Sequence, residues 1–174
     1  MYIIPVIMYG ADVWSLTVAS QRRLDAFDQW CLWHILRIPY TAHVSNSEVH
    51  SRTGQPPITT VIKQRRLELF GHVVQADQAE DHNRALRASL NPPSNWRRPR
   101  GRPHQTWLRT ISDDLKHLYL GLRLAYLQAQ GRSSWRKTVE TAMLTVGMMM
   151  MMMMNVKTFV VSTSCGLSCA KSGR

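Results

Sequence analysis

Apolar residues recur at helical spacing along most of the chain, in stretches that proline and glycine separate. The first long stretch runs from Thr17 to about Ile38, with apolar positions at steps of three and four residues: Leu24, Phe27, Cys31 and Ile35. This spacing predicts an amphipathic helix with one buried stripe. Thr17 is a favourable N-cap, and Pro39 ends the helix because the residue before a proline disfavours helical backbone.

Shorter helical patterns follow this first helix. Ser45 and Glu48 have the spacing of a capping box, and Gly54 can end the short helix that begins there. The Pro56–Pro57 pair pre-sets the start of a longer helix over Ile58–Val74. Weaker patterns predict helices near residues 82–90, 107–118, 122–129 and 134–143. We therefore expect an all-α fold, a small bundle of three to five helices with short connections.

Three segments depart from the helical pattern. Tyr2–Met8 is apolar and β-branched around Pro5, which predicts a short strand or an extended lead-in. Asn91–Pro103 is rich in proline and arginine and should be extended, because proline fixes φ and removes a backbone donor. Met148–Met154 is a run of methionine, which specifies a core poorly, and we expect residues 147–174 to form a disordered low-complexity tail.

These patterns divide the chain into five segments. An extended lead-in comes first, two groups of helices flank a basic Pro/Arg-rich connector, and a low-complexity tail follows. Their expected bounds are residues 1–16, 17–90, 91–103, 104–146 and 147–174.

The charge of the chain is large and unevenly distributed. The net charge is +11 and the sequence pI is about 10.3. Residues 1–51 hold three arginines against four acidic residues, whereas residues 52–174 hold 19 lysines and arginines against seven acidic residues. This asymmetry indicates a polyanionic partner, with nucleic acid ahead of an anionic membrane. The alternatives are a solvated basic face and a disordered basic tail, and charge alone excludes neither.

Cysteine usage and hydropathy bear on the compartment. An odd set of three cysteines, Cys31, Cys165 and Cys169, does not form a disulfide framework and favours a reducing compartment. No uncharged apolar run approaches the roughly 20 residues of a membrane span. We therefore expect an intracellular protein of the nucleus or cytoplasm, without a membrane partner.

The strongest local signal is the basic motif Arg98–Pro103. Its prolines hold the backbone extended, its glycine permits close approach, and its arginines suit the negative potential of a narrow minor groove, as in an AT-hook. The alternative, a generic phosphate-binding connector, is favoured because short basic motifs are common. The candidate nucleic-acid-binding residues here are Arg97, Arg98, Arg100, Gly101, Arg102 and Pro103, and Trp96 is a candidate for stacking on a base.

Several short sequence motifs, taken in their order along the chain, resemble one protein family. They are Met8–Trp14, Arg22–Phe27 with Cys31–Leu32, Arg52–Pro57, Arg65–Val73, Arg98–Pro103 with Thr106–Trp107, and Arg132–Arg136. Together they resemble the region downstream of the polymerase palm, the thumb and post-thumb, of LINE-type (non-LTR) retrotransposon reverse transcriptases. The resemblance covers roughly residues 8–140. It implies that residues 1–16 lead in from a missing palm and that residues 17–90 are a thumb-like bundle.

The resemblance implies descent from an RNA-templated DNA polymerase with an N-terminal endonuclease, but we expect this chain to bind nucleic acid without catalysing a reaction. Polymerase catalysis needs metal ions held by palm carboxylates, and the Asp113–Asp114 pair lies in a helical pattern, which we interpret as an exposed helical acid pair. In a thumb-like helix, Lys63, Arg65 and Arg66 would contact the template–primer backbone; the alternative is a solvated outer face. We expect no enzyme activity, catalytic residue, cofactor or small-molecule substrate.

The tail resembles the start of the zinc finger that some members carry. A structural zinc needs four cysteine or histidine ligands, and Cys165 and Cys169 supply two, so we expect no bound metal. The sequence thus predicts a fragment without palm or endonuclease, binding RNA or DNA electrostatically with weak sequence preference. Two alternatives stay open: a helical protein-interaction module, and a non-functional translated pseudogene remnant.

Overall fold

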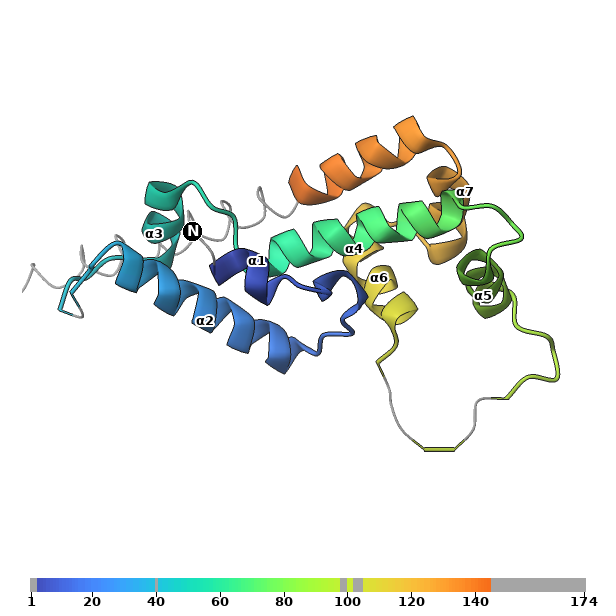
Figure 1. The fold of residues 1–174 in the computed structure, drawn as a ribbon, viewed down its shortest axis with the longest axis horizontal. Coiled ribbons are helices and arrows are strands. Elements are labelled where there is room, and N and C mark those ends of the chain that lie inside the picture. The colour runs from blue at the N-terminus through green and yellow to red at the C-terminus, as the bar shows by residue number, and fades with distance from the viewer. Residues whose placement is uncertain (1–2, 40, 98–99, 102–104, 145–174) are drawn as a thin grey trace, which may run out of the picture.

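The computed structural model describes residues 3–39, 41–97, 100–101 and 105–144 (Figure 1). These residues form helices and no strand, so the all-α prediction is confirmed. The α-helical segments number eight in the described residues, more than the three to five expected. In chain order they are α1 (Ile3–Ile7), α2 (Val18–Ile35), α3 (Asn46–Thr53), α4 (Ile58–Gln75), α5 (Asp81–Leu90), α6 (Trp107–Leu115), α7 (Leu122–Ala129) and a helix over residues 132–144, with short 3-10 turns η1 (Ala11–Val13) and η2 (Lys116–Leu118).

The helix ends follow from local side-chain chemistry. The Thr17 hydroxyl accepts a hydrogen bond from the Ser20 N–H at the start of α2, and the Ser45 hydroxyl accepts one from the Glu48 N–H at the start of α3. Gly54 ends α3 in the left-handed conformation, at φ 64°, a region where glycine lacks the Cβ clash of other residues. Both predicted N-caps and the predicted glycine C-cap are confirmed.

The N-terminal segment is helical where the sequence predicted an extended lead-in. Ile3–Ile7 forms α1, and Pro5 is tolerated because it falls in the first turn, where backbone N–H groups have no partner within the helix. Met8 and Ala11, which follow, are buried against Ile58 and neighbouring residues of α4. Packing thus overrides the β-propensity of this segment.

Helix α4 is the central element and contributes to two apolar clusters. Its first half joins Met8 and Ala11 through Ile58 and Ile62. Its second half contributes Leu67, Phe70 and Val74 to the main core, whose other buried members come from α5, α6, α7 and the 132–144 helix: Leu86, Ile111, Leu115, Ala125, Ala129, Trp135, Val139 and Ala142. Helices on both sides of the basic connector therefore share one core around α4 (Figure 1).

Helix α2 buries only part of the predicted stripe: Cys31 is buried, and Leu24 packs partly buried against the cluster that contains Met8 and Ile58. The helix contacts α3 and α4, and its buried residues are Asp28, Cys31 and Leu32. Phe27 and Ile35, expected in the buried stripe, are exposed by 43% and 48%. The spacing of apolar residues predicted the helix correctly but not the side that its partners cover.

None of the helices in the described residues has both the length and the apolar character needed to cross a membrane.

Candidate nucleic-acid interface

The basic connector (residues 91–103) lies between α5 and α6 in the chain, and its described residues, 91–97 and 100–101, lie to one side of the helices in Figure 1. Within it, Trp96, Arg97, Arg100 and Gly101 are exposed. Gly101 has φ 121°, a conformation that side-chain-bearing residues rarely adopt, so the glycine is needed there for backbone geometry. The remaining candidates in this segment, Arg98, Arg102 and Pro103, lie outside the described residues.

The three basic candidates on α4 do not share one surface. Arg65 is exposed, and its guanidinium Nη1 donates to the Met8 carbonyl oxygen at 3.4 Å. Lys63 is half-buried. Arg66 is fully buried, with no exposed surface. Lys63 and Arg65 stay available to a ligand, whereas the prediction that Arg66 contacts nucleic acid is wrong.

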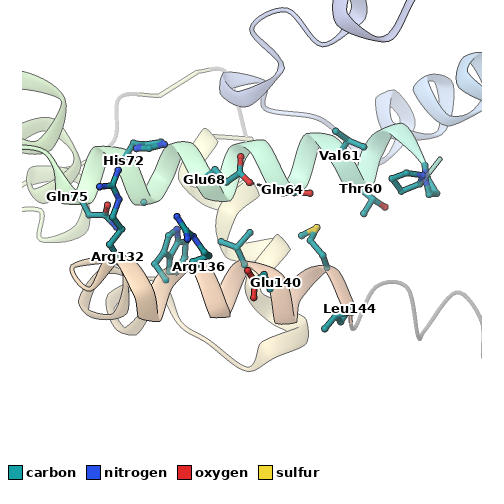
Figure 2. A pocket seen from close by; sticks show the side chains of 16 residues that line it. Thr60, Val61, Gln64, Glu68, His72, Gln75, Arg132, Arg136, Glu140 and Leu144 are labelled. Carbon is teal, nitrogen blue, oxygen red and sulfur yellow. Dashed lines mark hydrogen bonds between the residues drawn. The ribbon is translucent and has the colours of Figure 1, made fainter. Parts of the chain in front are cut away.

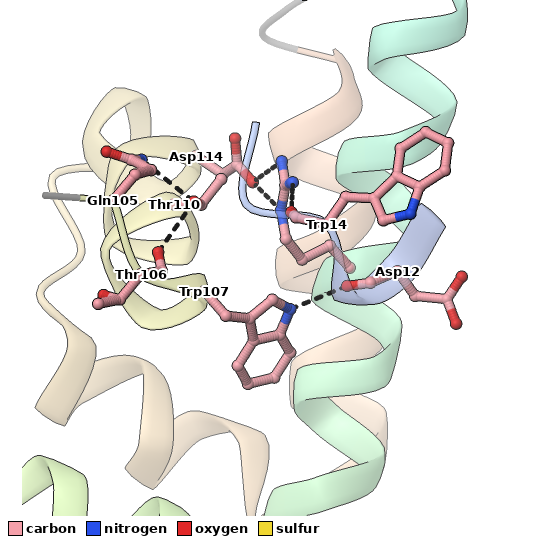
Figure 3. Close-up of polar contacts among 8 residues, drawn as sticks. Asp12, Trp14, Gln105, Thr106, Trp107, Thr110 and Asp114 are labelled. Atoms are coloured by element: carbon pink, nitrogen blue, oxygen red, sulfur yellow. Dashed lines mark hydrogen bonds and ion pairs between the residues drawn. The ribbon is translucent and has the colours of Figure 1, made fainter. Parts of the chain in front are cut away.

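The buried Arg66 is paired with Asp114 and with the backbone at Trp14 (Figure 3). Its Nε and Nη2 lie 2.8 Å and 2.6 Å from Oδ2 of Asp114 on α6, and its Nη1 donates to the Trp14 carbonyl oxygen at 3.1 Å. A buried guanidinium needs such pairing because an unpaired buried charge is strongly unfavourable. Arg66 therefore joins α4, α6 and the segment after η1.

The same ion pair revises the interpretation of the Asp113–Asp114 pair. Asp114 is buried rather than exposed; this burial raises its pKa, against the opposing effect of the Arg66 charge and its hydrogen bond. Asp113 is partly exposed and forms an ion pair with Lys116, whose hydrogen bond lowers the pKa of Asp113. Both carboxylates are thus paired with basic side chains of this chain.

The start of α6, the helix that follows the connector in the chain, is anchored by side-chain contacts. The Thr106 hydroxyl accepts from the Arg109 N–H and caps α6. The Trp107 indole Nε1 donates to the Asp12 carbonyl oxygen at 2.8 Å, across 95 positions of sequence (Figure 3). The Thr110 hydroxyl donates to the Thr106 carbonyl oxygen at 3.0 Å. These contacts hold the start of α6 in place.

A groove of about 830 Å³ runs between α4 and the 132–144 helix (Figure 2). Arg132 and Arg136 line it together with Glu68 and Glu140, so its formal charges balance. Apolar side chains line it as well: Pro56, Pro57, Val61, Trp135, Val139, Met143 and Leu144. With balanced charge and apolar walls, the groove has no preference for a polyanion.

Sequence reasoning missed an exposed row of side chains on α2 and just beyond it. Arg23, Phe27, Trp30, His34 and Arg37 are all exposed. Phe27, predicted to lie in the buried stripe, is 43% exposed, and Trp30 is 57% exposed. The steps of four, three, four and three residues between these positions are the signal that could have revealed a shared face.

Among the described residues, no group of three or more histidine, cysteine, aspartate or glutamate side chains could hold a metal ion. The cysteines of the zinc-finger-like tail and the methionine run lie outside the described residues. No protein-family model matches the chain, and no curated protein or solved structure matches it.

Proposed function

We propose that this chain is a non-catalytic helical module that binds RNA or DNA through phosphate contacts, with weak sequence preference. The observation that carries the proposal is the charge of residues 82–112, which contain seven arginines and no acidic residue. The arginines of this stretch that the structure describes are all exposed: Arg84, Arg87, Arg97, Arg100 and Arg109. Such a surface lowers the free energy of a bound polyanion, chiefly by releasing condensed counterions.

The position of the connector between α5 and α6 suits phosphate binding. The connector leaves α5 and returns to a capped α6 whose Trp107 is tied to the Asp12 backbone. The described connector arginines, Arg97 and Arg100, therefore lie between two helices that pack on the same core. Arg65 on α4 supplies a further exposed positive charge.

We propose a non-catalytic module because Asp113 and Asp114 are ion-paired with basic residues of the chain. Two-metal phosphoryl transfer needs carboxylates free to bind cations. Asp114 is held by Arg66 and Asp113 by Lys116, so the Asp-Asp pair supplies no such site. We further propose, from the motifs quoted above, that the chain derives from the thumb and post-thumb region of a LINE-type reverse transcriptase.

The proposal is tested by the salt dependence of nucleic-acid binding. The full chain should bind random-sequence duplex DNA and RNA, and log affinity should fall linearly with log salt between roughly 50 mM and 200 mM, with a slope of about −0.9 per phosphate contact on duplex DNA. An absence of binding at the low end of this range would contradict the proposal.

A helical protein-interaction module is the second candidate, and the groove between α4 and the 132–144 helix favours it. Its apolar walls and balanced charges suit an amphipathic partner helix better than a phosphate backbone. Binding to such a partner would persist at high salt, whereas nucleic-acid binding would weaken steeply. Salt dependence therefore separates the two candidates.

A further inference from the structure

The outward face of α2 carries a row of aromatic rings between two arginines. We call it the aromatic stripe: Phe27, Trp30 and His34, flanked by Arg23 and Arg37. The rings contact one another in sequence. The ring centroids of Phe27 and Trp30 lie 6.1 Å apart in a stacked arrangement, and those of Trp30 and His34 lie 4.1 Å apart. The stripe is about 20 Å long, from the helical rise per residue.

The orientation of His34 is fixed by a backbone contact. Its Nδ1 lies 2.9 Å from the Trp30 carbonyl oxygen. Because a carbonyl only accepts hydrogen bonds, Nδ1 carries the proton and donates. This bond holds the imidazole against the Trp30 indole, so the rings form a pre-organised surface rather than a set of independent side chains.

The acidic residues of α2 lie on another face of the helix. Asp28 is buried and accepts a hydrogen bond from the Ile58 backbone N–H. Asp25 accepts a hydrogen bond from the Thr59 hydroxyl at 2.8 Å. Both carboxylates therefore face the start of α4. The stripe itself combines aromatic surface with positive charge and contains no carboxylate, and this combination is complementary to a polyanion that has exposed bases.

The backbone at Arg37 is a second, independent observation. Arg37 has φ 51°, and the N–H groups of Arg37 and Ile38 donate to the His34 and Trp33 carbonyl oxygens at 3.2 Å and 3.1 Å. This is a Schellman motif, in which glycine usually occupies the left-handed position. A non-glycine residue in this conformation lowers stability, and such residues cluster at functional sites. The chain keeps an arginine at the end of the stripe although glycine would suit the fold better.

We infer that the aromatic stripe is a second nucleic-acid site and that it takes single strands. Unpaired bases stack on Trp30 and Phe27, and the phosphates beside them contact Arg23 and Arg37. In a duplex the faces of internal bases are covered by their neighbours, so flat aromatic side chains select unpaired bases. The inference rests on the proposed nucleic-acid binding and adds to it a separate site and a strand preference.

The first test compares Trp30→Ala with the parent, using a labelled oligo(dT) strand and a random-sequence duplex as probes. Loss of one stacking contact should weaken oligo(dT) binding by roughly 5- to 150-fold and leave duplex binding within about twofold. Trp30→Phe, which keeps a ring, should retain most of the affinity. Leu127→Ala, at an exposed apolar position of α7 that is 61% exposed, is the matched control and should change neither affinity.

The second test separates the charge of Arg37 from its effect on the fold. Arg37→Gly removes both the charge and the unfavourable left-handed side chain, so its thermal midpoint should rise while oligo(dT) binding weakens. The slope of log affinity on log salt should become shallower by about 0.7 on a single strand. Arg37→Lys should keep this slope. Arg123→Ala, at an exposed position of α7, is the charge-matched control.

Four outcomes would overturn the inference. These are unchanged oligo(dT) affinity in Trp30→Ala, an equal loss on oligo(dT) and duplex, unchanged oligo(dT) affinity in Arg37→Gly, or a parent dimer that Trp30→Ala dissociates, which would make the stripe an interface between copies of the chain. If duplex binding persists in any of these cases, the proposed function stands and the inference alone fails. If the parent binds neither probe, the proposed function fails with it.

Discussion

The buried Arg66–Asp114 ion pair determines how three segments of the chain meet. Arg66 lies on α4 and Asp114 on α6. The Trp14 carbonyl oxygen accepts a hydrogen bond from Nη1 of Arg66. Desolvating two charges is costly, and their attraction repays the cost only while both partners are present. We therefore expect the pair to fix how these segments meet rather than to add much net stability.

This account predicts an asymmetry between single and double substitutions. Asp114→Asn leaves the buried Arg66 charge without a counterion and should lower the free energy of unfolding by about 3–5 kcal/mol. The double variant Arg66→Met with Asp114→Leu removes both charges and should lie much closer to the parent. Urea unfolding measures both values. A double variant as unstable as Asp114→Asn would show that the ion pair is not the origin of the effect.

Asp28 gives a prediction about pH. Burial raises its pKa, more than the His50 charge and the Ile58 N–H lower it, and Asp25 raises it further. The folded chain therefore holds the Asp28 proton more tightly than the unfolded chain. It follows that unfolding free energy falls as pH rises through the interval just above the ordinary aspartate pKa of about 3.9.

Asp28→Asn should remove this loss while keeping an acceptor for the Ile58 N–H. The variant should be more stable than the parent at about pH 7, and the difference should vanish near pH 3, where Asp28 is protonated in both states. Chemical unfolding at the two pH values provides the measurement, with Glu140→Gln, at an exposed position, as the control. If the parent is more stable than Asp28→Asn at neutral pH, the claim that folding raises the pKa of Asp28 is wrong.

The sequence contains half of the information needed to place Arg66. Ile58, Ile62, Arg66 and Phe70 follow one another at steps of four residues and share the buried side of α4, so the periodicity could have indicated burial. Its partner could not be predicted, because Asp114 lies 48 positions further along the chain. The choice between a core ion pair and a phosphate contact depends on that distant carboxylate.

At the scale of helices, the contact between α4 and the 132–144 helix is set by a glycine. Trp135 is buried, its ring lies directly over Gly71, and its Nε1 donates to the Leu67 carbonyl oxygen at 2.9 Å. The Phe70 ring packs against Trp135 with centroids 5.5 Å apart. A Cβ at position 71 would overlap the Trp135 ring.

Gly71→Ala should therefore lower the free energy of unfolding by about 1–3 kcal/mol, although alanine is the better helix former, because an overpacked core loses stability. Gly121, whose Cβ position is open, is the matched control. Gly121→Ala should leave stability nearly unchanged. Thermal unfolding of the two variants provides the measurement, and equal midpoints would refute close packing at Gly71.

Helices with strong local signals were predictable from the sequence, and those without were not. Helix caps act over a few residues and can therefore be predicted from the sequence, as at Thr17, Ser45 and the left-handed Gly54. The short α1 has no such signal and is held by packing of the residues after it on α4. The exposed face of α2 was missed for the same reason, since distant helices decide which face is covered.

At the scale of the whole molecule, a core centred on α4 holds a basic connector between two anchored helices. The connector was identifiable from composition, because proline, glycine and arginine are informative without knowledge of the fold. The aromatic stripe was not, because a tryptophan on an amphipathic helix is equally compatible with core and surface. The charge distribution favours nucleic acid as the ligand, and the connector is the part of the surface that should contribute most.

The most direct measurement compares two triple variants of equal net charge. Arg98, Arg100 and Arg102→Ala removes three arginines from the connector, and the control variant Arg123, Arg132 and Lys137→Ala removes three exposed basic residues from α7 and the 132–144 helix. On random-sequence duplex DNA, the connector variant should reduce the steepness of the salt dependence by about 0.9 per lost phosphate contact, and the control variant should reduce it much less. Equal slopes in the two variants, or a connector variant that binds like the parent, would contradict nucleic-acid binding through the connector.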